Sequence, residues 1–145
     1  MDNRPIGVFD SGVGGLTVVD SLVQSTSSET IYYVGDTARV PYGNKSRERI
    51  QQYSEEIIDW LIKKDCKMVI VACNTASSLA IDYLKKKFSL PIIGVIDPVV
   101  QLAISRTKSQ SIGVIGTHAT IQSNAYGEKL KSTRPKINIF NQSCP

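Results

Sequence analysis

The most constraining feature of the sequence is an unbroken apolar stretch, residues 68–72 (MVIVA), that runs directly into Cys73-Asn74-Thr75. β-Branched and apolar residues bounded by polar ones are typical of a strand buried on both faces, in the middle of a parallel sheet. Ligands bind at the carboxyl edge of such sheets, and the amino end of the following helix favours negative charge. We therefore predict a strand-end cysteine, Cys73, whose surroundings lower its thiol pKa.

The rest of the chain alternates between short apolar runs and segments with helical apolar spacing. This alternation predicts an α/β fold with a doubly wound parallel sheet. We expect one near-complete domain over residues 1–97 and the start of a second, similar α/β domain over residues 98–145. No helix follows the last strand, so we expect the front part of a longer protein. Strands are predicted at residues 6–9, 30–34, 68–72, 91–95, 111–115 and 137–140, and helices at 16–23, 46–62, 75–87, 97–106 and 118–131.

Composition and charge narrow the class of protein. With 145 residues, 41% hydrophobic and 21% charged, the chain is long and apolar enough for a globular core. No apolar run approaches the roughly 20 residues of a membrane span, and the amino terminus lacks the order of a signal peptide, so we expect a cytoplasmic protein. The net charge of +4 comes without a basic stripe interleaved with aromatics, so we expect neither a nucleic-acid nor a membrane partner. The three scattered cysteines indicate free thiols and no metal site.

Polar residues gather after three of the predicted strands, and parallel strands end at the same edge of a sheet. Hydroxyl, amide and backbone N–H groups at that edge could hold the carboxylates of a small polar ligand. A long loop after the second strand could close over them, since long loops in compact domains are often functional. The candidate site residues are Asp10, Ser11, Pro41, Tyr42, Gly43, Cys73, Asn74, Thr75, Thr117 and Thr120.

Two other enzyme classes share parts of this pattern. Gly12-Val-Gly14 after the first strand, with Asp36 after the second, resembles a dinucleotide-binding unit, but Thr17 stands where its third glycine belongs. A cysteine hydrolase would pair Cys73 with the only histidine, His118, but the glycines that flank a nucleophile elbow are absent. We expect His118 to be an exposed or partly exposed residue near a helix start.

Four motifs together resemble a known family, the cofactor-independent glutamate racemases of the aspartate/glutamate racemase superfamily. They are residues 6–17 (IGVFDSGVGGLT), 33–43 (YVGDTARVPYG), 70–76 (IVACNTA) and 112–117 (IGVIGT), the last continuing to Tyr126. The resemblance covers essentially the whole chain, which corresponds to somewhat more than the first half of a typical member.

The resemblance implies racemisation of L- and D-glutamate by two cysteines that exchange the Cα proton, without cofactor or metal, to supply D-glutamate for peptidoglycan. Cys73 matches the cysteine that acts on the D-enantiomer, and Asp10 matches a residue that assists proton transfer. The other candidate residues match substrate-binding positions, and the full-length form could be a homodimer. The family's second cysteine lies in a Gly-Cys-Thr-His motif that this sequence lacks, so we expect that the chain alone does not racemise glutamate. An aspartate racemase relative and a non-catalytic amino-acid-binding fragment remain alternatives.

Overall fold

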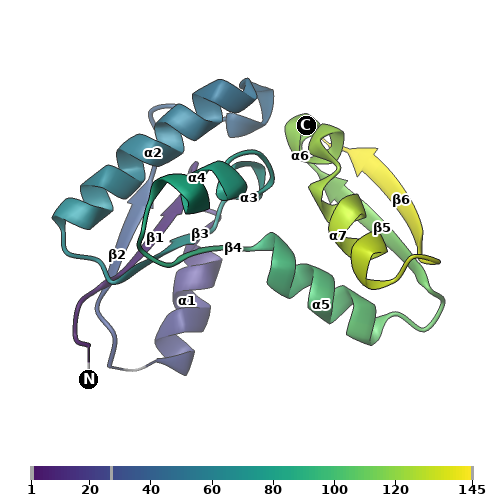
Figure 1. The fold of residues 1–145 in the computed structure, drawn as a ribbon, viewed down its shortest axis with the longest axis horizontal. Helices are drawn as coiled ribbons and strands as arrows, with labels where there is room; N and C mark the ends of the chain where they lie inside the picture. Colours follow the sequence, from purple (N-terminus) through teal and green to yellow (C-terminus); the bar gives the residue numbers. More distant parts are fainter. Residues whose placement is uncertain (1, 27, 145) are drawn as a thin grey trace.

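The computed structural model describes residues 2–26 and 28–144 and contains two parallel β-sheets (Figure 1). The first has the strand order β2-β1-β3-β4, so β1 and β3 lie in its interior, and the second pairs β5 with β6. This confirms the predicted α/β fold. The strands are β1 (Ile6–Asp10), β2 (Ile31–Gly35), β3 (Met68–Val71), β4 (Ile92–Gly94), β5 (Ser111–Gly116) and β6 (Asn138–Ser143).

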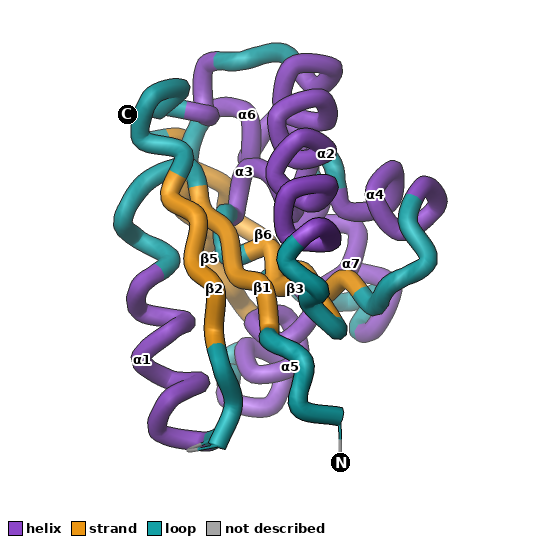
Figure 2. Tube along the Cα trace, turned by 90° about the vertical axis from the view of Figure 1, so that its left-hand side faces the viewer, coloured by secondary structure: helices purple, strands orange, loops and turns teal. Residues whose placement is uncertain are grey.

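Helices cover both faces of the first sheet, as the doubly wound prediction requires. Helix α1 (Leu16–Ser25) lies on one face, whereas α2 (Arg47–Lys63) and α4 (Ile81–Lys87) lie on the other (Figures 1 and 2). The side chains of α2 that meet the sheet are fully buried and form the main core with β1 and β3. Helix α1 has no fully buried residue, which leaves Met68 and Ile70 of β3 only half-buried. The prediction that this strand is buried on both faces is therefore wrong for the α1 side.

Two helices predicted as continuous are each divided. Residues 75–87 form α3 (Asn74–Leu79) and α4, separated at Ala80, whose φ of −120° leaves the helical range. Ala80 is fully buried, so its small side chain fits where the two helices turn against the core. The second division, at Asn124, separates α6 (His118–Ser123) from α7 (Ala125–Thr133) with a φ of 55°. Asparagine tolerates this left-handed conformation better than most residues.

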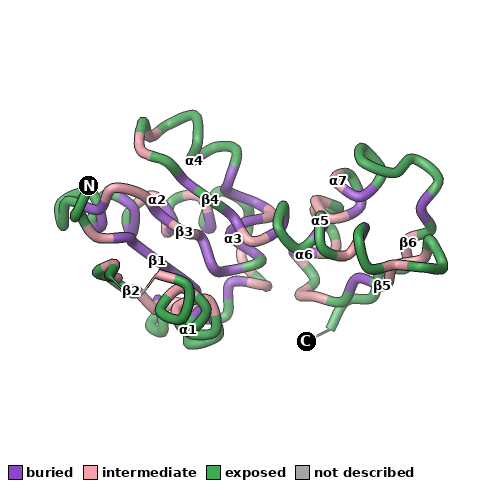
Figure 3. Tube along the Cα trace, turned by 90° about the horizontal axis from the view of Figure 1, so that it is seen from below, coloured by how far each residue is buried: buried purple, intermediate pink, exposed green. Residues whose placement is uncertain are grey.

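The second sheet is covered on one face only, within the part of the chain that the structure describes. Helices α5 (Ile96–Arg106) and α7 pack on that face around Val114. On the other face Ile115 is 77% exposed and Phe140 is 68% exposed, and Figure 3 shows β6 as mostly exposed. Helix α5 connects the two sheets (Figure 1). The division into domains at residue 97 stays a prediction.

Candidate functional site

Cys73 lies where β3 leads into α3, as the sequence predicts. It is the N-cap residue of α3, and its Sγ accepts a hydrogen bond from the backbone N–H of Ala76 at 3.5 Å. The thiol in turn donates to Ser11 Oγ at 3.6 Å. Because Ser11 directly follows β1, these contacts join the ends of the two interior strands. Only 5% of Cys73 is exposed, so its sulfur lies beneath the surface of the site.

The expected direction of the Cys73 pKa shift is wrong for the free protein. Burial raises the pKa of this thiol above its usual value, because a thiolate loses solvation in the protein interior. The hydrogen bonds from Ala76 and with Ser11 act in the opposite direction, and the nearby Asp10 carboxylate adds to the increase. The sequence shows the helix start and the polar neighbours, but it does not show how completely the packing excludes water.

Asp10 holds together the glycine-rich turn between β1 and α1. Its buried carboxylate accepts hydrogen bonds from the backbone N–H groups of Gly12 at 3.0 Å and Gly15 at 3.2 Å. A Cβ atom on Gly15 would lie 2.7 Å from Asp10 Cβ and 3.0 Å from Ala72 Cβ, so this close approach requires glycine. A dinucleotide phosphate would need these same N–H donors, and Asp10 already occupies them. The turn therefore does not support the dinucleotide alternative.

Tyr42 anchors the loop that follows β2. Only 1% of this tyrosine is exposed, and its hydroxyl donates to the buried carboxylate of Asp36. Arg39 also contacts Asp36, with 2.7 Å between Nε and Oδ2, and its guanidinium lies 4.2 Å from the centre of the Tyr53 ring. Burial and Asp36 raise the pKa of Tyr42, which keeps its hydroxyl protonated. Asp36 therefore orders the loop, and its carboxylate is not free to bind a ribose.

Three threonine hydroxyls connect the first sheet's helices to those of the second sheet. Thr75 Oγ1, in the first turn of α3, lies 3.0 Å from Thr117 Oγ1 and 3.4 Å from Thr120 Oγ1. The hydroxyls of Thr117 and Thr120 are themselves 3.0 Å apart. Gly43 packs directly against Thr117, since an added Cβ would lie 2.7 Å from Thr117 Cβ. Four predicted site residues therefore meet at one junction although they come from distant parts of the chain.

A second contact across this junction involves a residue that the sequence analysis did not select. The hydroxyl of Tyr126, in α7, donates to Asn74 Oδ1 at 2.6 Å. Tyr126 is the last residue of the fourth motif that resembles the racemase family, and this position was the only feature of the sequence that pointed to it. A single tyrosine on an amphipathic helix usually packs in a core, so nothing in the local pattern distinguishes it.

A cleft of about 640 Å³ lies between the two sheets' helices. Asp10, Asn74, Thr117 and Thr120 of the predicted residues line it, together with Tyr126. The other predicted residues are not among those that line the cleft, and they are Ser11, Pro41, Tyr42, Gly43, Cys73 and Thr75. Hydroxyl and amide donors beside one acidic group suit a small ligand that carries both carboxylates and an ammonium group.

Other kinds of site find little support among the residues that the structure describes. No three His, Cys, Asp or Glu side chains there gather as metal ligands would. His118 is exposed at the start of α6, as expected, and does not line the cleft. No helix in the described ranges has the length and apolar character needed to cross a bilayer.

Comparison with known proteins identifies the family. Residues 6–139 match the family model described as Asp/Glu/Hydantoin racemase. A glutamate racemase from Staphylococcus aureus is 46% identical over 99% of this chain, which spans 54% of that protein. The structure of glutamate racemase RacE1 from Bacillus anthracis matches with a TM-score of 0.96 at 41% identity, covering 100% of this chain and 55% of that one.

A third match is the glutamate racemase of Francisella tularensis, solved in complex with D-glutamate. It has a TM-score of 0.91 at 43% identity, and the match covers 99% of this chain and 54% of that one. The chain thus spans about half the length of the relatives that it matches. Since the family model covers nearly all of the sequence, this chain belongs to the Asp/Glu/Hydantoin racemase family.

Proposed function

We propose that this chain carries one catalytic half of a glutamate racemase, in which Cys73 exchanges the Cα proton of D-glutamate. The observation that carries the proposal is the position of the Cys73 thiol, which contacts Ser11 and lies directly before Asn74, a residue of the cleft wall. The relatives named as glutamate racemases, and the Francisella tularensis structure with bound D-glutamate, support glutamate as the substrate.

The chemistry of glutamate fits the groups at the cleft. Its two carboxylates can accept hydrogen bonds from the hydroxyls of Thr117 and Thr120 and from the amide of Asn74. Its ammonium group can pair with the carboxylate of Asp10. A Cα proton is only weakly acidic, so removing it requires positioned donors that stabilise the charge that develops on the substrate. We propose that Asp10 assists this proton transfer while it holds the turn after β1.

The raised pKa of Cys73 has two consequences for such a reaction. Fewer molecules carry a thiolate at neutral pH, but each thiolate that forms is a stronger base toward the Cα proton. The positive ammonium group of a bound amino acid would stabilise the thiolate beneath it, because opposite charges at short range favour the ionised form. Substrate binding would therefore activate the base.

Racemisation requires a second base on the opposite side of the Cα atom. The other two cysteines in the described part of the chain do not line the cleft: Cys66 is buried before the start of β3, and Cys144 is exposed after β6. We therefore propose that the 145-residue chain exchanges the Cα proton without net racemisation, and that the full-length form supplies the second base. By the same family relationship, we propose that the full-length form is a cytoplasmic homodimer that supplies D-glutamate for peptidoglycan without a cofactor.

The test is Cα deuterium exchange of D-glutamate in heavy water, followed by proton NMR. We expect exchange with the unmodified chain and none with Cys73→Ser. Cys66→Ser is a matched control, since Cys66 is as buried as Cys73 but lies at the opposite end of β3, and it should retain exchange. Exchange by Cys73→Ser at the unmodified rate would contradict the proposal.

Further outcomes separate the alternatives. Equal binding of D-glutamate by the unmodified chain and Cys73→Ser, with exchange by neither, would indicate a non-catalytic binding fragment. Faster exchange with aspartate than with glutamate would indicate an aspartate racemase relative. Rapid net racemisation by the 145-residue chain, measured by chiral chromatography, would show that a second base is already present.

A further inference from the structure

Two of the side chains that line the cleft are hydrogen-bonded to each other although they lie 52 positions apart in the chain. Tyr126, half-buried in α7, donates its hydroxyl proton to Oδ1 of Asn74, the first residue of α3. The 2.6 Å separation is short for a neutral O–H···O hydrogen bond. Both residues line the cleft, so the contact belongs to the ligand-facing surface.

The direction of this hydrogen bond fixes the orientation of the Asn74 amide. A carboxamide has an acceptor oxygen and a donor NH₂ group at opposite ends of one plane. Burial raises the pKa of Tyr126, so its hydroxyl stays protonated and remains a donor at neutral pH. Since Asn74 Oδ1 accepts the hydrogen bond from Tyr126, the hydrogens on Nδ2 remain available to another acceptor. Without the tyrosine hydroxyl, the amide could rotate and present its oxygen to the cleft.

We propose that Tyr126 is a positioning residue that holds the Asn74 amide with its NH₂ group available to a carboxylate in the cleft. A carboxylate accepts hydrogen bonds and repels an amide oxygen, so a rotated amide would weaken its binding. The identity of the ligand, D-glutamate, rests on the proposed function, whereas the orientation of the amide does not.

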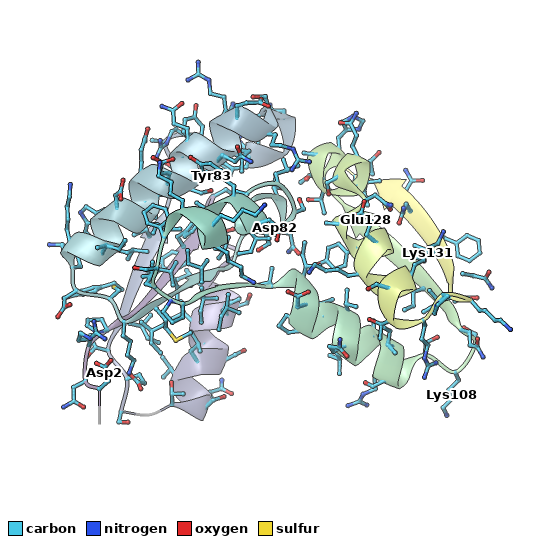
Figure 4. The ribbon with its side chains drawn as sticks, viewed as in Figure 1. Asp2, Asp82, Tyr83, Lys108, Glu128 and Lys131 are labelled. Atoms are coloured by element: carbon cyan, nitrogen blue, oxygen red, sulfur yellow. The ribbon has the colours of Figure 1, made fainter. Side chains whose placement is uncertain are left out.

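The threonine hydroxyls allow this role to be separated from a structural one. Thr75, Thr117 and Thr120 hold α3 against α6 by their own hydrogen bonds, which do not involve Tyr126. Tyr126→Phe keeps the aromatic ring and removes only the hydroxyl, so the junction should stay closed. A matched control is Tyr83→Phe. The hydroxyl of Tyr83, in α4 (labelled in Figure 4), donates to Glu55 of α2 at 2.7 Å, and neither residue lines the cleft.

The first test needs no ligand. In ¹⁵N-labelled protein, the side-chain NH₂ signals of Asn74, assigned from their loss in Asn74→Ala, should shift in Tyr126→Phe and stay in place in Tyr83→Phe. Thermal unfolding should be cooperative in both variants. Unchanged Asn74 signals in a folded Tyr126→Phe protein would overturn the proposal. If Tyr126→Phe does not fold, the deciding measurement is the D-glutamate affinity of Asn74→Asp, which keeps an acceptor for Tyr126 and removes the NH₂ donor. An affinity equal to that of the unmodified chain would then overturn the proposal.

The second test measures D-glutamate affinity by calorimetry. Tyr126→Phe should weaken binding by about threefold to tenfold, the usual effect of one hydrogen bond, and Asn74→Asp should weaken it more. In an Asn74→Ala background Tyr126→Phe should have no further effect, because the tyrosine acts through that amide. An equal loss of affinity in both backgrounds would show a merely structural role. Failure of the unmodified chain to bind D-glutamate would contradict the proposed function, while the Asn74 signals would still decide the role of Tyr126.

Discussion

Replacing Gly43 by alanine should push apart the junction between the two sheets' helices. The added Cβ would lie 2.7 Å from Thr117 Cβ and 2.8 Å from Thr117 Cγ2, closer than real Cβ contacts allow. Ordinary van der Waals contact begins at 3.4 Å, so the two groups must separate by about 0.7 Å. If Thr117 moves away from the loop and from Thr75, their Oγ1 distance grows from 3.0 Å to about 3.7 Å, beyond hydrogen-bond range.

The expected loss of stability combines two effects. Overpacking of this kind costs about 1–3 kcal/mol, and the lost hydroxyl contact adds about 1 kcal/mol, for a total of about 2–4 kcal/mol. For a chain of 145 residues, this corresponds to a decrease in melting temperature of roughly 7–13 °C. The Gly43 φ angle is not positive, so the cost comes from contact with Thr117 and not from backbone strain.

The assay is urea unfolding followed by circular dichroism, with Gly113→Ala as the matched control. Gly113 lies in β5, and a Cβ added there meets no atom within 4 Å. That variant should change the free energy of unfolding by less than about 1 kcal/mol, in the stabilising direction. Equal effects of the two substitutions would refute the reasoning, since they would show that Gly43 is not closely packed against Thr117.

Two further predictions concern charge. In a variant whose other two cysteines are serine, alkylation of Cys73 by iodoacetamide should rise with pH, with a midpoint above about 8.5, because burial raises the pKa of this thiol. The stability that the protonated Cys73 thiol contributes should be present below about pH 8.5 and should be lost as pH rises through the folded-state pKa. A midpoint of alkylation below about pH 8.5 would contradict the raised pKa. Arg39→Met should lower the free energy of unfolding by about 2–3 kcal/mol in urea titrations, since it leaves the buried Asp36 carboxylate with only the Tyr42 hydroxyl. Arg4→Met, which breaks exposed ion pairs with Asp2 and Asp65, should leave the free energy of unfolding nearly unchanged, and equal effects of the two substitutions would argue against the Asp36 contact.

The order of strands and helices, and the edge of the sheet that carries the site, could be predicted from sequence because both follow from local patterns. The apolar run before Cys73 predicts an interior strand, and polar residues at the ends of parallel strands must meet at one edge. The divided helices were missed because their causes are not periodic. Ala80 leaves the helix where buried packing demands a turn, and Asn124 does so through a left-handed conformation.

The sequence by itself determined the α/β fold, the family and the position of Cys73 at a strand end. Only the tertiary structure decided that the Cys73 thiol has a raised pKa, because desolvation depends on side chains from several distant segments. The tertiary structure also decided that the Asp10 carboxylate accepts hydrogen bonds from the turn after β1, and that the Tyr126 hydroxyl donates a hydrogen bond to Asn74. These properties depend on distances between residues far apart in the chain, which no local pattern of residue types encodes.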